Sequence, residues 1–526
     1  MPTTREAHAG CVPPVPARVA PVAFVAVNAV VFWLVRPDVP DLWAARARAA
    51  AAAHGVGLTY WFSWFGGSVP GGYSVMTPFL SAVAGAEVVA AVAAVAVSTT
   101  AVPLLLGTRR PTAAAWVAAI AVVTNLWCGR VPFLLGAAFA VPSLLMVLRR
   151  RPVAAGALAV LSVAASPVAG AFLVLVLSGA LLTRGLRQHR ASALVTGGCG
   201  LGSLALVAIL FGSPGPEPFP PYLLAESLAA VALMLLLGTS RHLRVTLVVS
   251  AAAALVVFAV PNGLGANFAR LALFCLPAAA VALSPRRRAA VAALVAPIIV
   301  LGGLTSVSAA QSAAKPGSHP SYYAALAAEL DTRPGLADHR LELVSPGWAA
   351  YAVLAGQAML ARGWETQSTR ALDAVVYSRS LDAAGYRAWL DDNAVGYVAI
   401  NTGGSASTPE ARLVGSGRLG FLRLVWSHAS WRLYHVRRAT PVVEAPARLD
   451  AWSQAAIRVR VPRAGQTLVR VRWSRFLTAS PLLPAATAGS QANRGDGYHP
   501  TLSPGPGGWT TLVTNRPGTY VLTGAW

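Results

Sequence analysis

Apolar runs alternate with short arginine-rich clusters along the first 304 residues of the chain. Most runs approach the roughly 20 apolar residues that a helix needs to cross a bilayer, and charged residues are scarce inside them. We therefore predict about eleven membrane-spanning helices. They cover residues 19–35, 80–106, 112–126, 131–148, 152–165, 168–183, 191–212, 222–239, 243–260, 267–283 and 288–304.

Arginine occupies every second gap between these runs. Short, positively charged loops stay in the cytoplasm, so the alternation predicts a plasma-membrane protein with a cytoplasmic N-terminus and an extracytoplasmic region from about Thr305 onward. The clusters are Arg18, Arg109–Arg110, Arg149–Arg151, Arg184/Arg187/Arg190, Arg241/Arg244 and Arg286–Arg288. Ser166–Pro167 interrupts the stretch 152–183, which forms either two tilted helices or a broken, re-entrant pair.

The pattern changes after residue 304. Residues 305–320 read as a linker, residues 321–424 mix helical and strand periodicity, and residues 425–526 alternate with a period of two. The predicted elements are helices at 322–330, 348–360 and 380–392 and strands at 340–344, 396–400, 431–436, 456–461, 467–473, 509–513 and 518–522. The chain is thus expected to join an α-helical polytopic membrane domain, 1–304, to an extracytoplasmic α/β subdomain and a β-sandwich or barrel.

Composition agrees with this class. The chain has 526 residues, 56% of them hydrophobic, and a mean hydropathy of +0.58. Its formal charge of +23 is spread over both halves without a compact basic motif, so we expect membrane lipid and no nucleic acid as a partner. All four cysteines lie in the membrane half or its N-terminal tail, which predicts no disulfide framework outside.

The acidic residues of the membrane half collect on its outer side. Except for Glu6, all of them map to outer loops or the outer halves of helices: Asp38, Asp41, Glu87, Glu217 and Glu226. Because cytoplasmic loops are short and filled with arginine, a single outer acid such as Asp38 needs no special role. Glu87 and Glu226, however, are predicted to lie ~6 to 10 Å below the helix ends, where an ionisable group usually faces a cavity.

The first exterior loop, residues 36–79, is much longer than the other loops of the membrane half. It contains Asp38 and Asp41, a helix-forming run at 44–53, an aromatic stretch with Trp61 and Trp64, and a glycine- and proline-rich return through Tyr73. One interpretation is a binding loop. The other is an interfacial helix followed by an aromatic belt at headgroup depth.

This loop resembles the first exterior loop of the GT-C superfamily of membrane glycosyltransferases, in which an acid contacts the acceptor or acts as its base. The resemblance assigns that role to Asp38 and Asp41. More closely, the chain resembles a family of actinobacterial polytopic membrane proteins, the YfhO-like and 6-pyruvoyl-tetrahydropterin-synthase-related membrane proteins. The strings that carry this resemblance are 60–78, 127–136, 165–170, 267–271 and 360–365. The GT-C superfamily includes the catalytic subunit of oligosaccharyltransferase. This chain departs from the pattern of that subunit because it lacks a second acidic loop motif.

Arg130 and Arg270 lie at outer helix boundaries, against the positive-inside trend. An arginine fork suits phosphate oxygens, and extension of each side chain toward the lipid headgroups is an equally good interpretation. Asn267 is expected to line the same pocket. No acidic pair has metal-binding spacing, so no cofactor is predicted and a divalent metal is unsupported.

These observations favour a membrane transferase. It would move a sugar from a polyprenyl-phosphate donor to an envelope glycan or glycolipid acceptor, with Asp41 or Asp38 as base. Glu87, Arg130, Arg270, Glu226, Trp61, Trp64, Tyr73 and Asn267 would bind substrate. The alternatives are a transporter or flippase of a lipid-linked or small substrate and a non-catalytic envelope scaffold. A transporter usually shows internal repeats, and none is found in the sequence.

Overall fold

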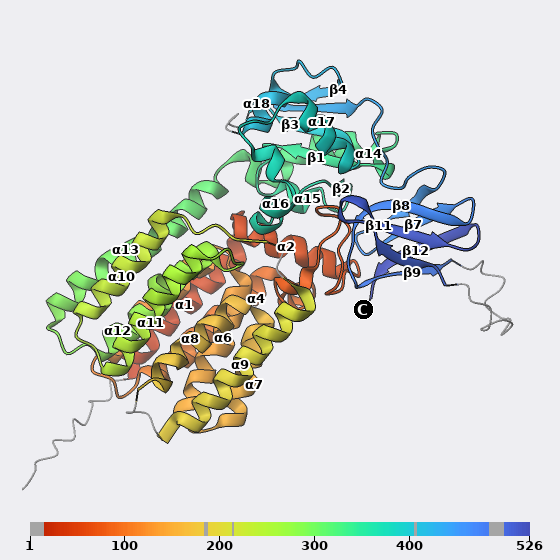
Figure 1. The fold of residues 1–526 in the computed structure, drawn as a ribbon. Helices are drawn as coiled ribbons and strands as arrows, with labels where there is room; N and C mark the ends of the chain where they lie inside the picture. The colour runs from red at the N-terminus through yellow and green to blue at the C-terminus, as the bar shows by residue number, and fades with distance from the viewer. Residues whose placement is uncertain (1–14, 184–187, 213–214, 404–407, 483–498, 526) are drawn as a thin grey trace, which may run out of the picture. The chain divides into compact units, whose positions relative to one another are not determined.

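A computed structural model describes residues 15–183, 188–212, 215–403, 408–482 and 499–525 of the chain (Figure 1). The chain folds into two compact units. The first comprises the residues up to Ala45 and Gly72–Ala314, and the second comprises Arg46–Gly71 and Lys315–Trp526. Helix α2 (Pro40–Ala53) crosses this division, so the long first loop contributes to both units.

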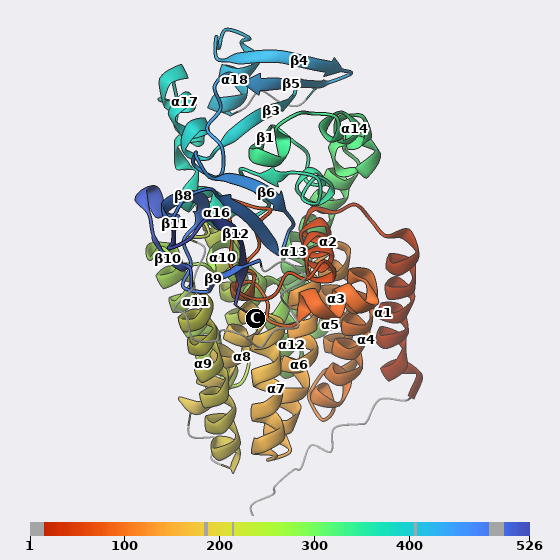
Figure 2. The same cartoon turned by 90° about the vertical axis from the view of Figure 1, so that its right-hand side faces the viewer.

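The first unit is a bundle of apolar helices (Figure 2). Within the described residues, seven segments are long and apolar enough to cross a membrane, which fits the predicted class of membrane protein. Four further apolar helices are shorter: α5, α7, α8 and α10. The helices are α1 (Val15–Val35), α3 (Thr77–Ala84), α4 (Ala86–Leu105), α5 (Pro111–Trp127), α6 (Val131–Leu148), α7 (Pro152–Ala165), α8 (Pro167–Leu181), α9 (Arg190–Phe211), α10 (Pro221–Leu236), α11 (Arg241–Ala259), η3 (Gly265–Phe268), η4 (Leu271–Cys275), α12 (Leu276–Leu283) and α13 (Arg288–Ala313). Helix α13 includes residues 305–313, the first part of the expected linker.

Arginine clusters that are far apart in the sequence gather at one end of the first unit. Contacts join their loops: Arg110 with the backbone oxygen of Arg286, Arg286 Nε with Leu236 O at 3.2 Å, Arg150 Nη2 with Gln188 Oε1 at 2.6 Å, and Thr183 with His242. Helices α4, α6, α8 and α10 end here, and α5, α7, α9 and α11 begin here. The gaps that contain arginine thus lie at one end of the helix bundle, and the gaps between them lie at the other end. Arg184 and Arg187 lie outside the described residues.

The stretch 152–183 folds as two consecutive helices that meet at Ser166, whose backbone is extended. Helix α7 begins and α8 ends at the arginine-rich end, so the pair turns back on itself. The carbonyl groups released at the break are bonded by the loop that returns from the second unit. Val75 N donates to Ala164 O at 2.8 Å, and Ser74 Oγ donates to Ala165 O at 2.8 Å. The break is thereby closed by protein.

The second unit begins with a mixed sheet in the order β2-β1-β3-β5-β4. Strands β1 (Arg340–Val344), β2 (Met359–Leu360) and β3 (Val395–Asn401) are parallel, and β4 (Leu422–His428) and β5 (Trp431–Val436) are added antiparallel. Its helices are α14 (Ala324–Asp331), α15 (Ala350–Val353), α16 (Thr366–Leu372), α17 (Ala383–Asp392) and α18 (Pro409–Gly415). The predicted strands at 340–344 and 396–400 are confirmed. The predicted helix over 348–360 is confirmed only at α15 (Ala350–Val353), because Met359 and Leu360 form β2, which pairs with β1.

Two antiparallel sheets follow, in the orders β10-β11-β8 and β6-β7-β12-β9. The strands are β6 (Arg448–Trp452), β7 (Ala456–Val461), β8 (Gly465–Arg472), β9 (Leu477–Pro481), β10 (Thr501–Pro504), β11 (Trp509–Thr514) and β12 (Gly518–Gly524). Both sheets supply side chains to one core, among them Val469, Leu512, Val459 and Leu522. Two sheets around one core make a β-sandwich, which is one of the two arrangements that the period-two pattern left open.

The first loop supplies part of this core. Tyr60 and Phe62 are buried among the sandwich residues, with ring centroids 4.6 Å apart. Tyr60 Oη donates to Arg472 O at 2.6 Å, and Phe62 N donates to Gln454 O at 3.0 Å. Burial raises the pKa of the Tyr60 hydroxyl far above its usual value. The segment is therefore an integral part of the second unit.

Candidate functional site

Asp41 lies between two arginines in the first unit. Its Oδ2 atom is 3.6 Å from Arg130 Nε and 3.9 Å from Arg270 Nη2. The three side chains keep 32%, 13% and 18% of their surface exposed, so they are sheltered but still accessible. All three residues were singled out from the sequence, and they come from three separate helix starts: α2, α6 and η4. The fold brings them together at the end opposite the arginine clusters.

The two arginines are held by reciprocal stacking. Arg130 immediately precedes α6, and its guanidinium lies 5.4 Å from the ring centre of Phe274 in η4. Arg270 immediately precedes η4, and its guanidinium lies 5.4 Å from the ring centre of Phe133 in α6. A cation over an aromatic face is stabilised by the negative face of the ring. Arg130 is thus held by a ring of η4, and Arg270 is held by a ring of α6.

Asn125 and Gly129 complete the support. Arg130 Nη1 donates to Asn125 Oδ1 at 3.0 Å, which orients the fork. Gly129 has a positive φ of 74°, and a Cβ atom there would lie 2.7 Å from the Cβ of Leu42. Only glycine allows this turn and this approach without strain. The close contact brings the first turn of α2, and with it Asp41, up to Arg130.

The cluster keeps unused capacity for a ligand. Within the described residues, Arg270 makes the ion pair with Asp41 and no hydrogen bond, although a guanidinium carries five N–H donors. Both ion pairs use Asp41 Oδ2, which leaves Oδ1 outside them. Two guanidinium groups and one carboxylate give a net positive charge. The arrangement suits an anion with several oxygens, such as a phosphate.

The other sequence candidates of the first unit lie around this cluster or apart from it. Tyr73 is close enough to Arg270 to interact with it electrostatically. Asp38 is half-buried just before α2, and Glu87 is half-buried in the first turn of α4. Glu226 is half-buried in α10, and the backbone N–H of Asn267, inside η3, donates to Leu264 O at 3.0 Å. Asp41, Arg130, Arg270 and Tyr73 are therefore the candidates that the structure joins.

Trp61 and Trp64 belong to the interior of the second unit, and both side chains are buried. Their ring centroids are 4.2 Å apart. Trp61 Nε1 donates to Gln454 Oε1 at 3.0 Å, and Trp64 Nε1 donates to Tyr351 O at 3.1 Å. Because both faces and donors are used inside the protein, the structure supports a packing role for these rings more than a substrate-binding one.

A second cluster of charges is buried in the α/β part of the second unit. Arg362 Nε donates to Glu342 Oε1 at 2.9 Å, and Arg362 Nη2 donates to Glu410 Oε2 at 2.7 Å. Burial raises the pKa of both glutamates, and their two charges raise the pKa of Arg362. Burial also raises the pKa of the neighbouring Asp373 to about 6. This cluster could not be predicted from the sequence, because its members are far apart along the chain.

No protein-family model matches this chain, and no curated protein matches it either. Among the residues that the structure describes, no three or more His, Cys, Asp or Glu side chains are placed to hold a metal ion. The geometry of the Asp41 cluster is therefore the basis for a functional argument.

Proposed function

We propose that this protein is a polytopic membrane transferase of the GT-C type. It would move a sugar from a polyprenyl-phosphate donor to an envelope glycan or glycolipid acceptor. The observation that carries the proposal is the placement of Asp41 between Arg130 and Arg270. Arg270 and Arg130 would bind the donor phosphate and stabilise the negative charge that develops as the sugar leaves. Asp41, through Oδ1, would accept the proton of the acceptor hydroxyl.

The proposal includes a topology. Adding the four shorter apolar helices to the seven long segments gives eleven spans, which agrees with the number of apolar runs. The arginine-rich end of the first unit would face the cytoplasm. The Asp41 cluster and the second unit would then lie on the outer side, where a lipid-linked sugar meets an envelope acceptor.

A transporter has less support. In many transporters, broken helices expose backbone carbonyls that coordinate the transported ion or substrate. The carbonyls of Ala164 and Ala165 at the α7–α8 break already accept bonds from Ser74, Val75 and Thr77. The break thus offers no open ligand site at these two groups. A non-catalytic scaffold would not need the unused donors of Arg270.

Transfer from a polyprenyl-phosphate sugar by the purified full chain tests the proposal. Asp41→Asn removes the proton acceptor and should lower the rate by about a hundredfold to ten-thousandfold. Asp38→Asn, measured in parallel, tests the other loop acid. Asp450→Asn is the matched control, since Asp450 forms a surface ion pair with Arg460 at 3.3 Å in the second unit. If Asp41→Asn and Asp38→Asn, alone and together, leave transfer intact, the transferase mechanism is wrong.

Arg270→Gln separates donor binding from proton transfer. It keeps a polar side chain but removes the charge and the fork, so the KM for the donor should rise while the KM for the acceptor changes little. Equal changes in both constants would contradict the assignment of Arg270 to the donor phosphate.

A further inference from the structure

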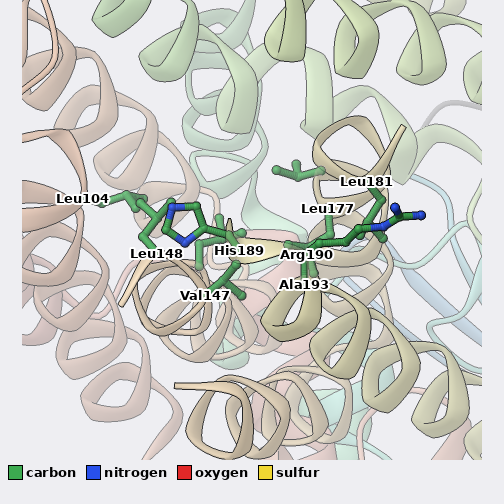
Figure 3. A pocket seen from close by; sticks show the side chains of 10 residues that line it. Leu104, Val147, Leu148, Leu177, Leu181, His189, Arg190 and Ala193 are labelled. Atoms are coloured by element: carbon green, nitrogen blue, oxygen red, sulfur yellow. The ribbon is translucent and has the colours of Figure 1, made fainter. Parts of the chain in front are cut away.

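A separate cavity of about 160 Å³ opens at the arginine-rich end of the first unit (Figure 3). Its walls are apolar and come from four helices, with Leu104 of α4, Leu148 of α6, Leu177 and Leu181 of α8 and Ala193 of α9. An apolar cavity of ~150 Å³ is large enough to hold a hydrocarbon the size of benzene. The space therefore suits a piece of a hydrocarbon chain.

The rim of this cavity is polar. His189 lies beside Leu104 and Leu148, and the guanidinium of Arg190 extends past the apolar side chains (Figure 3). His189 Nδ1 is buried and has no hydrogen-bond partner among the described residues. Arg150 is held close by, because its Nη2 donates to Gln188 Oε1 at 2.6 Å. Hydrocarbon walls under a cationic rim match a lipid that carries a negative headgroup.

This cavity is distinct from the Asp41 cluster. Arg130 precedes the first residue of α6, whereas Leu148 is its last residue. The 18 residues of α6 span roughly 27 Å at the usual rise, so the two sites lie at opposite ends of the helix. A donor that is bound at Arg130 and Arg270 does not place its phosphate at Arg190.

We propose that the cavity binds part of one acyl chain of an anionic membrane phospholipid, with its phosphate at Arg190 and His189. The choice of an anionic phospholipid rests on the proposed topology, because such lipids are concentrated in the cytoplasmic leaflet. Basic pockets between spanning helices on that side are common sites for lipid headgroups. The bound lipid would fill the gap between α4, α6, α8 and α9.

Retention of lipid by the purified full chain in detergent tests the cavity. The probes are dioleoylphosphatidylglycerol and its zwitterionic counterpart dioleoylphosphatidylcholine, counted on the protein by native mass spectrometry. Ala193→Leu places a larger side chain in the cavity and displaces about two methylene groups of the lipid chain. Phosphatidylglycerol retention should therefore fall about tenfold. Ala205→Leu is the control, because Ala205 is an exposed alanine of the same helix, twelve residues away. Unchanged retention in Ala193→Leu would overturn the site.

The rim is tested with Arg190→Gln, which should lower phosphatidylglycerol retention about fivefold and leave phosphatidylcholine unchanged. Arg241→Gln is matched to it, because Arg190 and Arg241 are both the exposed first residue of an apolar helix. An equal loss in Arg241→Gln would mean a diffuse attraction and would contradict the site.

Displacement of phosphatidylglycerol by an equimolar amount of undecaprenyl phosphate would reassign the cavity to a polyprenyl lipid and also overturn the proposal.

Two further measurements separate this inference from the proposed function. Asp41→Asn should retain phosphatidylglycerol like the unmodified chain, so a loss of transfer and a loss of lipid binding are distinguishable. A reporter fused after Arg150 should be active in the cytoplasm. Activity outside would overturn the topology on which the lipid choice rests, whereas cytoplasmic activity without phosphatidylglycerol retention would overturn the lipid site alone.

Discussion

The protein contains two clusters of arginine and carboxylate side chains. One has two arginines and one carboxylate, and the other has one arginine and two carboxylates. In the first unit one carboxylate, Asp41, lies between Arg130 and Arg270, and its side chain is 32% exposed. In the second unit one arginine, Arg362, lies between Glu342 and Glu410, and the exposed fractions of these side chains are 5% or less. The Asp41 pairs are 3.6 and 3.9 Å long, whereas Arg362 makes hydrogen bonds of 2.7 and 2.9 Å.

This difference separates a cluster that can bind from one that holds structure. Long, partly exposed ion pairs contribute little to stability, but they leave donors and oxygens for a ligand. A buried arginine between two carboxylates costs desolvation, and breaking such a group leaves charges without a partner. Burial and bond length, more than residue type, thus indicate which of two similar clusters is a site.

The largest effect on stability is expected from Arg362→Met. The change leaves Glu342 and Glu410 buried without a cation, and the loss should be about 3 to 5 kcal/mol in the free energy of unfolding of the second unit. Urea unfolding of the detergent-solubilised chain, followed by tryptophan fluorescence, measures it. Arg412→Met is the control, since Arg412 is exposed on the neighbouring α18. A loss below about 1 kcal/mol would mean that the buried cluster is dispensable.

The pH dependence of the second unit should follow the raised carboxyl pKa values. Burial raises the pKa of Asp373 to about 6, so the folded state binds a proton more tightly than the unfolded state, whose value is about 3.9. The contribution of Asp373 to stability is then largest below about pH 4 and is lost as the pH rises toward 6. Asp373→Asn should remove about 2 to 3 kcal/mol of this decline. Unfolding midpoints at pH 4, 5, 6 and 7 check it, and an unchanged slope in the variant would contradict the assignment.

A smaller effect is expected from Gly129→Ala, which tests how Asp41 is positioned. The new Cβ would meet Leu42 at 2.7 Å on a backbone with a positive φ. The cost should be about 1 to 3 kcal/mol, accompanied by slower transfer. Gly107→Ala is matched to it, because Gly107 has a φ of 80° and no neighbouring atom within 4 Å of the added Cβ. If both variants lose transfer equally, the contact with Leu42 does not position the site.

The smallest change in stability is expected from Asp41→Asn, in contrast to its effect on transfer. Partly exposed ion pairs contribute about 0 to 1 kcal/mol, and asparagine caps a helix start nearly as well as aspartate. Thermal unfolding should therefore shift by no more than a few degrees, as for a loss below about 1 kcal/mol. A loss as large as that of Arg362→Met would show that Asp41 is a structural residue.

Much of this architecture could be predicted from the sequence, because the signals are local. Hydrophobic runs gave the helices of the first unit, and period-two alternation gave β5, β7 and β12. Arg130 and Arg270 could be singled out as charges at apolar helix boundaries, and Asp41 through the resemblance of the first loop to the GT-C loop. Their mutual distances could not, since these depend on the turn at Gly129 and on the start of η4. The supporting rings, Phe133 and Phe274, look like ordinary core residues in an apolar helix.

The assignment of the first loop needed tertiary information. Its aromatic residues have the composition of a membrane belt as well as that of a core, and the sequence left both interpretations open. The structure places Trp61 and Trp64 inside the second unit, where Gly363 allows close packing because a Cβ there would lie 2.7 Å from the Trp64 ring. Trp64 of the aromatic stretch and Gly363, which is about 300 positions later in the sequence, are therefore packed together in the second unit.

The membership of residues 46–71 in the second unit has a consequence for biogenesis. Tyr60 and Phe62 leave the ribosome early, yet their partners Val471 and Leu522 are made more than 400 residues later. At ~5 to 20 residues per second, this interval lasts roughly 20 to 90 seconds. During that time Tyr60 and Phe62 lack these core partners, while the helices of the first unit that follow them are synthesised. A ribosome that stalls before β12 therefore leaves Tyr60 and Phe62 without part of their core, and such a product should be exposed to proteolysis.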